Sequence, residues 1–237
     1  MLDGRMRAQI ARGLDPIGRS LRQAGITADV LTVVGLAFSV GTALLIATGH
    51  LGWAVVGVVV SGLVDLLDGS VARVSGRASP RGAFFDSVVD RLSDGLMFGG
   101  VAWYLAAGDR PTLAVLALAV ALVSLVVSYE RARAESLGFD ARGGLMERAE
   151  RMVLLAIGLA FGVLVAVLWV LLVLTSLTAV HRFVKVWRQA SLPPADAAAP
   201  APTRPRPSRN LSAWWERHPA TRRWRERQAR RPTRPRR

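Results

Sequence analysis

The chain contains no cysteine, and its 17 acidic residues are few beside 31 basic ones. The first absence excludes disulfides, thiolate catalysis and Cys-ligated metals. The shortage of acid leaves a formal net charge of +14, which can indicate a nucleic-acid-binding protein. No recognition motif accompanies the charge, and the basic residues gather between apolar runs, as they do in the cytoplasmic loops of membrane proteins. We therefore expect no nucleic-acid partner.

Residues 1–28 lack the apolar core of a secretory signal, because charged residues interrupt them throughout, among them Arg5, Arg12, Asp15 and Arg19. This pattern predicts an amphipathic, basic helix that lies at a membrane surface. A frayed tail is the alternative interpretation.

Long apolar runs dominate the next part of the chain, and 51% of all residues are hydrophobic. Several runs approach the ~20 residues needed to cross a bilayer. We expect an all-α integral membrane domain over residues 29–189 with six transmembrane helices. The expected spans cover about residues 30–48, 51–72, 82–107 and 111–135, and two more share 148–188.

The last stretch could also be one long helix, since residues 152–180 contain neither charge nor proline. Six spans place every basic cluster on one side of the membrane, as the positive-inside rule requires, whereas five do not. We therefore predict a tight turn near Gly162. The same rule places both termini in the cytoplasm. We expect the protein to lie in the cell membrane.

Residues 190–237 are rich in Pro, Ala and Arg and cannot bury enough apolar surface to fold alone. Thirteen arginines lie at or beyond Arg204, with Trp214, Trp215 and Trp224 among them. We expect a disordered cytoplasmic tail that binds anionic membrane lipid. Nucleic-acid binding is the rival interpretation.

Two pairs of aspartates interrupt the second and third expected spans. Asp65 and Asp68 are three residues apart, and Asp86 and Asp90 are four apart, so each pair shares one helix face. A short loop joins the two helices, which brings the pairs to the same end. Four carboxylates need a compensating cation, and oxygen ligands favour Mg²⁺ or Mn²⁺ over zinc. Two such ions are a common device for phosphoryl chemistry, so we expect two per site.

The run from Asp65 to Asp90 matches the signature D-x2-D-G-x2-A-R-x8-G-x3-D-x3-D without a gap or substitution. In this run, and over about residues 10 to 188, the chain resembles the CDP-alcohol phosphatidyltransferase family. The resemblance implies a homodimer with a divalent-metal site that opens to the cytoplasm. It implies that an alcohol hydroxyl attacks the phosphorus nearest the diacylglycerol of a CDP-linked lipid and that CMP leaves.

The resemblance also assigns roles by position. Asp65, Asp68 and Asp86 look like metal ligands, and Asp90 looks like the general base that can also touch a metal. The residues that look like the CDP-diacylglycerol site are Asp29, Thr32, Gly69, Ala72, Arg73 and Ser79. Ala28 stands where members often have proline. Asp94 continues the stripe of Asp86 and Asp90, and we expect it to support the site from behind or to pair with Arg91.

A second polar cluster follows the fourth expected span, in the segments Ser-Tyr-Glu-Arg-Ala-Arg-Ala-Glu (128–135) and Gly-Gly-Leu-Met-Glu-Arg-Ala-Glu-Arg (143–151). These segments are similar to those of phosphatidylinositol-phosphate synthases, which use inositol 1-phosphate as the acceptor. Arg131 departs from that pattern, which usually has Lys there. The candidates for the acceptor-phosphate site are Ser128, Arg131, Arg133, Arg148, Arg151 and Arg182. Membrane anchoring and Arg–Glu pairing are the plainer interpretation of any single arginine.

Other functions remain open at this point. A phosphatidylglycerophosphate synthase would use the same metal site with glycerol 3-phosphate. A cation transporter could use the aspartates, but the opposite helix ends lack ionisable groups for a path. A scaffold that acts through the basic tail is a third class.

Overall fold

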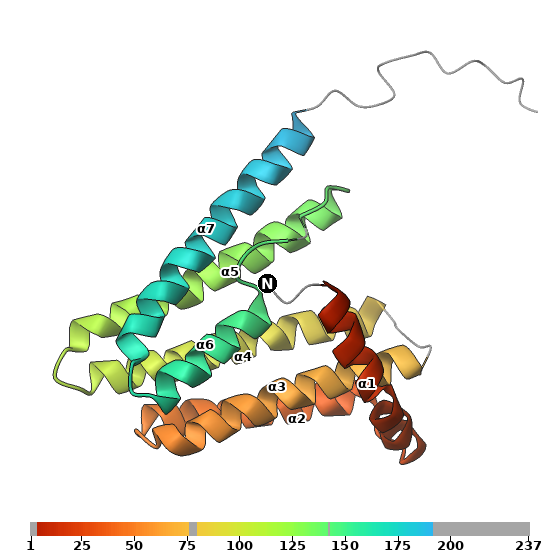
Figure 1. Cartoon of the computed structure of the whole chain (residues 1–237), viewed down its shortest axis with the longest axis horizontal. Coiled ribbons are helices and arrows are strands. Elements are labelled where there is room, and N and C mark those ends of the chain that lie inside the picture. The colour runs from red at the N-terminus through yellow and green to blue at the C-terminus, as the bar shows by residue number, and fades with distance from the viewer. Residues whose placement is uncertain (1–3, 76–79, 142, 192–237) are drawn as a thin grey trace, which may run out of the picture. The chain divides into compact units, whose positions relative to one another are not determined.

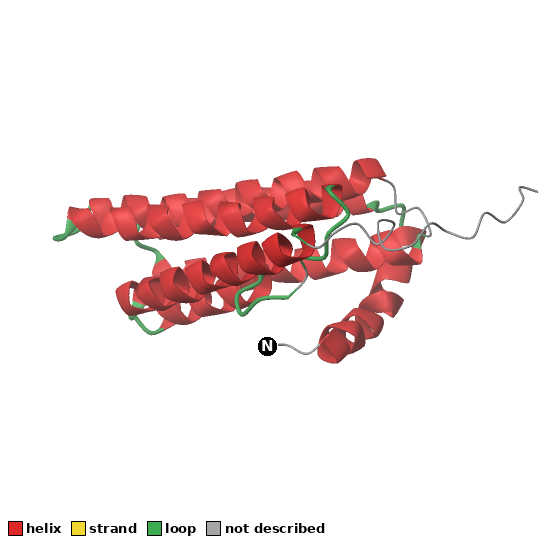
Figure 2. Cartoon of the chain, turned by 90° about the horizontal axis from the view of Figure 1, so that it is seen from above, coloured by secondary structure: helices red, strands yellow, loops and turns green. Residues whose placement is uncertain are grey.

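The computed structural model describes residues 4–75, 80–141 and 143–191, with side chains from residue 13 onward, all of them in the unit Met1–Ser191. This part is entirely helical and contains no strand (Figure 2), which confirms the all-α prediction. The elements are α1 (Gly4–Gln23), α2 (Ala28–Ala47), α3 (Leu51–Val74), α4 (Pro80–Ala106), the 3-10 helix η1 (Pro111–Leu113), α5 (Ala114–Ser136), α6 (Arg148–Ala160) and α7 (Leu164–Ala190).

Four helical segments are long and apolar enough to cross a membrane: α2, α3, η1 with α5, and α7. The chain is therefore a multi-pass membrane protein. The other two expected spans, α4 and α6, are not among these segments. Helix α4 has 27 residues but carries several charges in its first half. Helix α6 has 13 residues, which at ~1.5 Å per residue is shorter than the ~30 Å hydrocarbon layer.

The final apolar stretch forms two helices, as predicted, and the alternative of one long helix is wrong. Helix α6 ends at Ala160 and α7 begins at Leu164. Gly162 lies between them with φ +67°, in the left-handed region that glycine enters without steric cost. The chain therefore reverses direction near Gly162.

The helices pack as three antiparallel hairpins, α2–α3, α4–α5 and α6–α7 (Figure 1). Helix α2 also contacts α4, α5 contacts α7, and α6 contacts both α3 and α7. The three short turns within the hairpins lie at one end of the bundle, while α1 lies near the other end. The core includes Ile46, Phe98, Leu155 and Leu168, all fully buried.

Large apolar side chains such as Trp53, Leu122, Phe161 and Trp169 are exposed. In a water-soluble protein such exposed side chains would promote aggregation, but the hydrocarbon of a bilayer solvates them. Between the helices, small residues allow close approach instead. A Cβ added to Gly100 of α4 would lie 2.5 Å from the carbonyl oxygen of Ala43 in α2.

Candidate active site

Three of the four signature aspartates converge at one point. Asp65 and Asp68 come from α3 and Asp86 from α4, and each offers a carboxylate oxygen within 4.8 Å of the others. Asp68 is buried, and its Oδ2 accepts a hydrogen bond of 3.3 Å from the hydroxyl of Thr32 on α2. Asp90 lies one helical turn beyond Asp86. The i,i+3 and i,i+4 spacings place each pair on one helix face, and the packing of α3 and α4 on α2 brings Asp65, Asp68 and Asp86 together, with Asp90 outside this group of three.

This donor set fits a hard divalent cation. Every candidate ligand is a carboxylate oxygen, and the three side chains already share one small volume. Mg²⁺ and Mn²⁺ prefer such ligands, whereas zinc and copper sites generally recruit His or Cys. The Thr32 hydroxyl also lies 3.0 Å from the carbonyl oxygen of Ala28, so its single proton is shared between that acceptor and Asp68.

Arg148, the first residue of α6, lies against the acidic cluster. Its Nη1 is 2.6 Å from Asp65 Oδ1 and 2.8 Å from Asp90 Oδ1. Its Nε donates to Asp94 Oδ1 at 3.1 Å. The guanidinium thus compensates the negative charge of two helices at once, which places a candidate for acceptor binding beside the candidate base.

Of the two expectations for Asp94, the pairing with Arg91 is wrong, whereas support of the site from behind is compatible with its contacts. Arg91 lies 3.8 Å from Asp90 instead. Asp94 is buried and faces α6, where it contacts Arg148 and Arg151. Asp94 follows Asp90 by one helical turn but is more deeply buried, and there the two arginines of α6 reach it.

A cavity of about 990 Å³ opens beside the acidic cluster. Asp65 and Asp90 line one part of it. The acceptor candidates that line it are Ser128, Arg131, Arg148, Arg151 and Arg182. The sixth candidate, Arg133, is exposed on α5 and does not line this cavity. Five residues from three helices that are far apart in sequence therefore meet around one space.

Arg182 reaches this cavity from α7 and is almost fully buried. Its Nε donates to the carbonyl oxygen of Gly143 and its Nη1 to that of Val127, both at 2.9 Å. Its Nη2 lies 3.9 Å from Glu147. These bonds tie α7 to α5 and to the loop before α6, so the guanidinium has little freedom to move.

The expected nucleotide side lies at the end of α3. Gly69, Ala72 and Arg73 occupy its last two turns, and Arg73 also lines the cavity. Asp29 is exposed in the first turn of α2. Ser79 lies outside the described residues. A Cβ added to Gly69 would lie 3.4 Å from Arg73 Nη1, which is an ordinary contact, so the protein chain itself does not require glycine at this position.

Sequence reasoning did not single out the contact between α1 and this region. Asp15 Oδ1 accepts a hydrogen bond from Ser70 Oγ at 3.3 Å and lies 3.7 Å from Arg73 Nη2. Gly18 packs against Ser70, where a Cβ would clash. The only sequence signal was Asp15 as an acid in a basic helix, because 55 residues separate it from Ser70.

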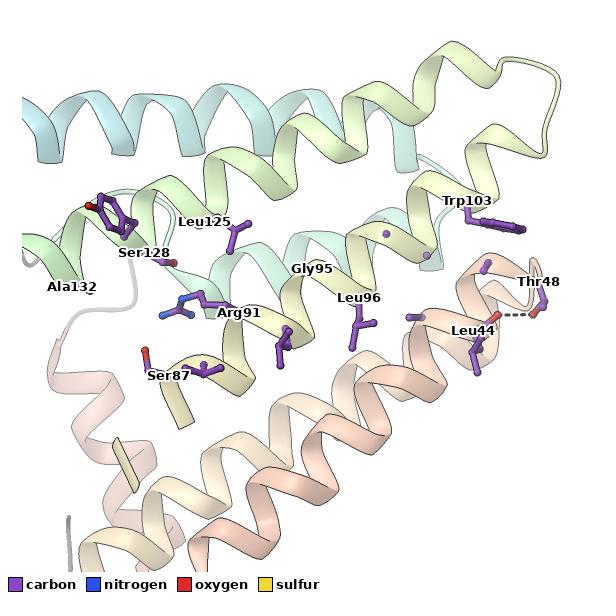
Figure 3. A pocket seen from close by; sticks show the side chains of 17 residues that line it. Leu44, Thr48, Ser87, Arg91, Gly95, Leu96, Trp103, Leu125, Ser128 and Ala132 are labelled. Atoms are coloured by element: carbon purple, nitrogen blue, oxygen red, sulfur yellow. Dashed lines mark hydrogen bonds between the residues drawn. The ribbon is translucent and has the colours of Figure 1, made fainter. Parts of the chain in front are cut away.

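Another hollow, of about 1150 Å³, runs along α4 between α2 and α5 (Figure 3). Its lining is largely apolar, with Leu96 and Trp103 toward the end that carries the hairpin turns. Arg91 and Ser128 lie toward its other end and also line the first cavity. The two hollows therefore approach each other at the polar end of α4.

Known proteins resemble this chain over most of the described bundle. The sequence model of the CDP-alcohol phosphatidyltransferases matches residues 25–187. The chain belongs to this family. It is a transferase of phospholipid biosynthesis, and its acidic cluster could hold a divalent metal ion.

Relatives of this transferase include two named phosphatidylinositol phosphate synthase. The protein of Mycobacteroides abscessus is 39% identical over 185 residues, which cover 74% of this chain and 84% of the relative. That of Corynebacterium glutamicum is 40% identical over 192 residues, which cover 77% and 87%.

Solved structures of the phosphatidylinositol phosphate synthase of Mycobacterium tuberculosis share the fold. One, with CDP-DAG bound, has a TM-score of 0.68 at 37% identity and covers 74% of this chain and 94% of its own. Another, in complex with manganese and citrate, has a TM-score of 0.69 at 36% identity and covers 73% and 88%.

Proposed function

We propose that this transferase moves the phosphatidyl group of CDP-diacylglycerol to inositol 1-phosphate, giving phosphatidylinositol phosphate and CMP. The observation that carries the proposal is the single cavity in which Asp65 and Asp90 lie beside Arg131, Arg148 and Arg182. Carboxylates suit a metal–diphosphate complex, and several arginines suit an acceptor that itself carries a phosphate. The names of the relatives support the same acceptor.

Asp65, Asp68, Asp86 and Asp90 are the residues that would hold divalent cations, Mg²⁺ or Mn²⁺, and we propose two ions per site. The convergence of three of these carboxylates supports this assignment, as does the manganese-containing structure of a relative. When bound, the cations would neutralise the donor's diphosphate and the oxygen that leaves with CMP.

Asp90 is the proposed general base, and Arg148 and Arg91 are the cations nearest to it. The carboxylate takes the proton of the acceptor hydroxyl as that oxygen forms a bond to the phosphorus nearest the diacylglycerol. The bond from this phosphorus to the bridging oxygen breaks, and CMP leaves with the electron pair. The phosphatidyl group is then an ester of the acceptor, and Asp90 carries the proton.

The remaining residues are assigned to two parts of the site, one for the CDP group and one for the acceptor's phosphate. Asp29, Gly69, Ala72, Arg73 and Ser79 are proposed to hold the CDP group, with Thr32 acting through its hydrogen bond to Asp68. The proposed acceptor-phosphate residues are Ser128, Arg131, Arg133, Arg148, Arg151 and Arg182. An apolar arm of the cavity between α3 and α6, lined by Val59, Leu63, Val153 and Ile157, would suit an acyl chain.

The membrane arrangement is also a proposal. We propose that α4 and α6 complete six spans with the other four segments, although α6 alone is shorter than the hydrocarbon layer, and that both termini are cytoplasmic in the cell membrane. Residues 1–28 then form the juxtamembrane segment, 29–189 the catalytic domain, and 190–237 a tail on anionic lipid. The apolar groove along α4 offers a surface for the second subunit of a homodimer (Figure 3).

An acceptor screen tests the activity. Purified full-length protein with CDP-diacylglycerol and Mg²⁺ should release CMP with inositol 1-phosphate, and chelation should stop the release. Release with glycerol 3-phosphate alone would instead identify a phosphatidylglycerophosphate synthase. Metal flux into proteoliposomes without any nucleotide turnover would identify a transporter.

A further inference from the structure

Asp94 is a buried carboxylate outside the metal motif, and it touches two arginines of another helix. Its side chain is 5% exposed. Its Oδ1 accepts a hydrogen bond from Arg148 Nε at 3.1 Å, and its Oδ2 accepts one from Arg151 Nη2 at 2.9 Å. Asp94 is not among the carboxylates that converge on the metal position. Both of its oxygens serve arginines, so it does not act as a metal ligand.

The two arginines need such a partner because of where α6 places them. They are three residues apart on one helix face, and Arg151 is 2% exposed. Two guanidinium groups side by side repel each other, and burial removes the water that would screen them. A single carboxylate between them offsets this repulsion and fixes both planes, because each charge-assisted hydrogen bond is directional.

The same contacts leave a donor pointing at no acceptor. Arg151 Nη1 donates to the carbonyl oxygen of Met146 at 3.3 Å, and Nη2 donates to Asp94. Its Nε is buried and meets no hydrogen-bond acceptor within the described part of the chain. A buried, charged donor without a protein partner is rare, and a water molecule or an anion supplies the missing acceptor in such sites. Arg151 lines the cavity that also holds Arg148 and Arg182.

We propose that Asp94 is a positioning residue for the acceptor's phosphate, because it holds Arg148 and Arg151 in the orientation that receives a phosphate monoester. This inference rests on the proposed function, and it names what sets the acceptor site. Asp94 also couples the two halves of the reaction centre, since the arginine that it orients through Nε contacts Asp65 and Asp90 through Nη1.

The test is the variant Asp94→Asn in the full-length protein with Mg²⁺. Asparagine keeps the volume but loses the charge and one acceptor oxygen. The KM for inositol 1-phosphate should rise about tenfold or more, because a buried charge loses its partner, while the KM for CDP-diacylglycerol stays within about twofold. Inhibition by inorganic phosphate, which competes with the acceptor, should weaken by the same factor. Asp109→Asn, at an exposed turn between α4 and η1, is the matched control.

A purely structural ion pair would give a different result. It would lower the amount of active enzyme, and hence the apparent kcat, with both KM values unchanged, and that outcome would overturn the inference. If Asp94→Asn does not fold, Asp94→Glu replaces it: the charge stays but moves by one methylene, so the acceptor KM should rise selectively. An unchanged acceptor KM in that variant would equally overturn it.

The wild-type protein separates this inference from the proposed function. A wild type that releases CMP only with an unphosphorylated alcohol would overturn both. Alternatively, the wild type could be active with inositol 1-phosphate while Asp94→Asn has the same acceptor KM and the same inhibition by phosphate. That outcome would overturn only the role of Asp94.

Discussion

The acidic and the basic sides of the cavity are built in different ways. The acidic side comes from α3 and α4, two helices joined by one short connection, and its four aspartates lie within 26 residues of sequence. The basic side comes from α5, α6 and α7, and its arginines span residues 131–182. Arg148, Arg151 and Arg182 are held by contacts with other elements, namely Asp94 on α4 and the carbonyl groups of Val127 and Gly143.

This difference separates local from tertiary order. The acidic side gathers its carboxylates through helix periodicity and one short connection, with both α3 and α4 packed on α2. The basic side exists only after α6 and α7 pack on the rest of the bundle, because buried guanidinium groups require partners from elsewhere. Substitutions on the acidic side should therefore act on the chemical step, and those on the basic side on acceptor binding.

The largest expected effect is that of Asp90→Asn on the acidic side. Loss of the proton acceptor should lower kcat about 10²–10⁴-fold while the protein stays folded, since asparagine keeps the shape. CMP release measures the rate, and thermal unfolding in detergent checks the fold. Asp109→Asn removes a carboxylate at the other end of α4 and should leave kcat unchanged. A near-normal kcat in Asp90→Asn would show that another group takes the proton.

Removal of Arg182 tests the basic side. Arg182→Met should raise the KM for inositol 1-phosphate about 10–100-fold, because hydrogen bonds to a charged group are worth about 1.5–3 kcal/mol. Its effect on kcat should be smaller than that of Asp90→Asn. Steady-state kinetics with each substrate varied in turn measures this split. Arg188→Met, exposed farther along α7, is the control. A loss confined to kcat would place Arg182 with the chemical step.

Gly100→Ala acts on neither side directly but on the packing of α4, which carries the acidic side. The added Cβ would meet the Ala43 carbonyl oxygen at 2.5 Å, so α2 and α4 must move apart. Overpacking of this kind costs about 1–3 kcal/mol of stability. Denaturation in detergent should show the loss, whereas Gly99→Ala, whose Cβ meets nothing within 4 Å, should show none. Equal stability of both variants would mean that the helices approach less closely.

The smallest effect is expected from truncation after Gln189. Both sides of the cavity lie before this residue, and the cut keeps Gln189, whose side chain bonds the backbone of Asp140 at 2.7 and 2.9 Å. Turnover should change by less than about twofold, because we expect the removed segment, from its composition, to add little to the fold. Affinity for anionic vesicles should fall, as sedimentation would show. A large loss of turnover would give the tail a role in catalysis.

Much of this protein was determined by its sequence alone. Apolar runs and basic loops predict a helical membrane protein, and the spacing of Asp65, Asp68 and Asp86 predicts their meeting, because helix periodicity and a short connection act locally. The turn at Gly162 also followed from the placement of charge.

The tertiary structure decided what depends on contacts between distant segments. Asp94 faces Arg148 and Arg151 and not Arg91, and Arg133 stays outside the cavity that Arg131 lines. Asp15 of α1 reaches Ser70 and Arg73. No sequence pattern specifies such pairs, because burial and helix packing, and not spacing along the chain, decide which buried charges must compensate each other.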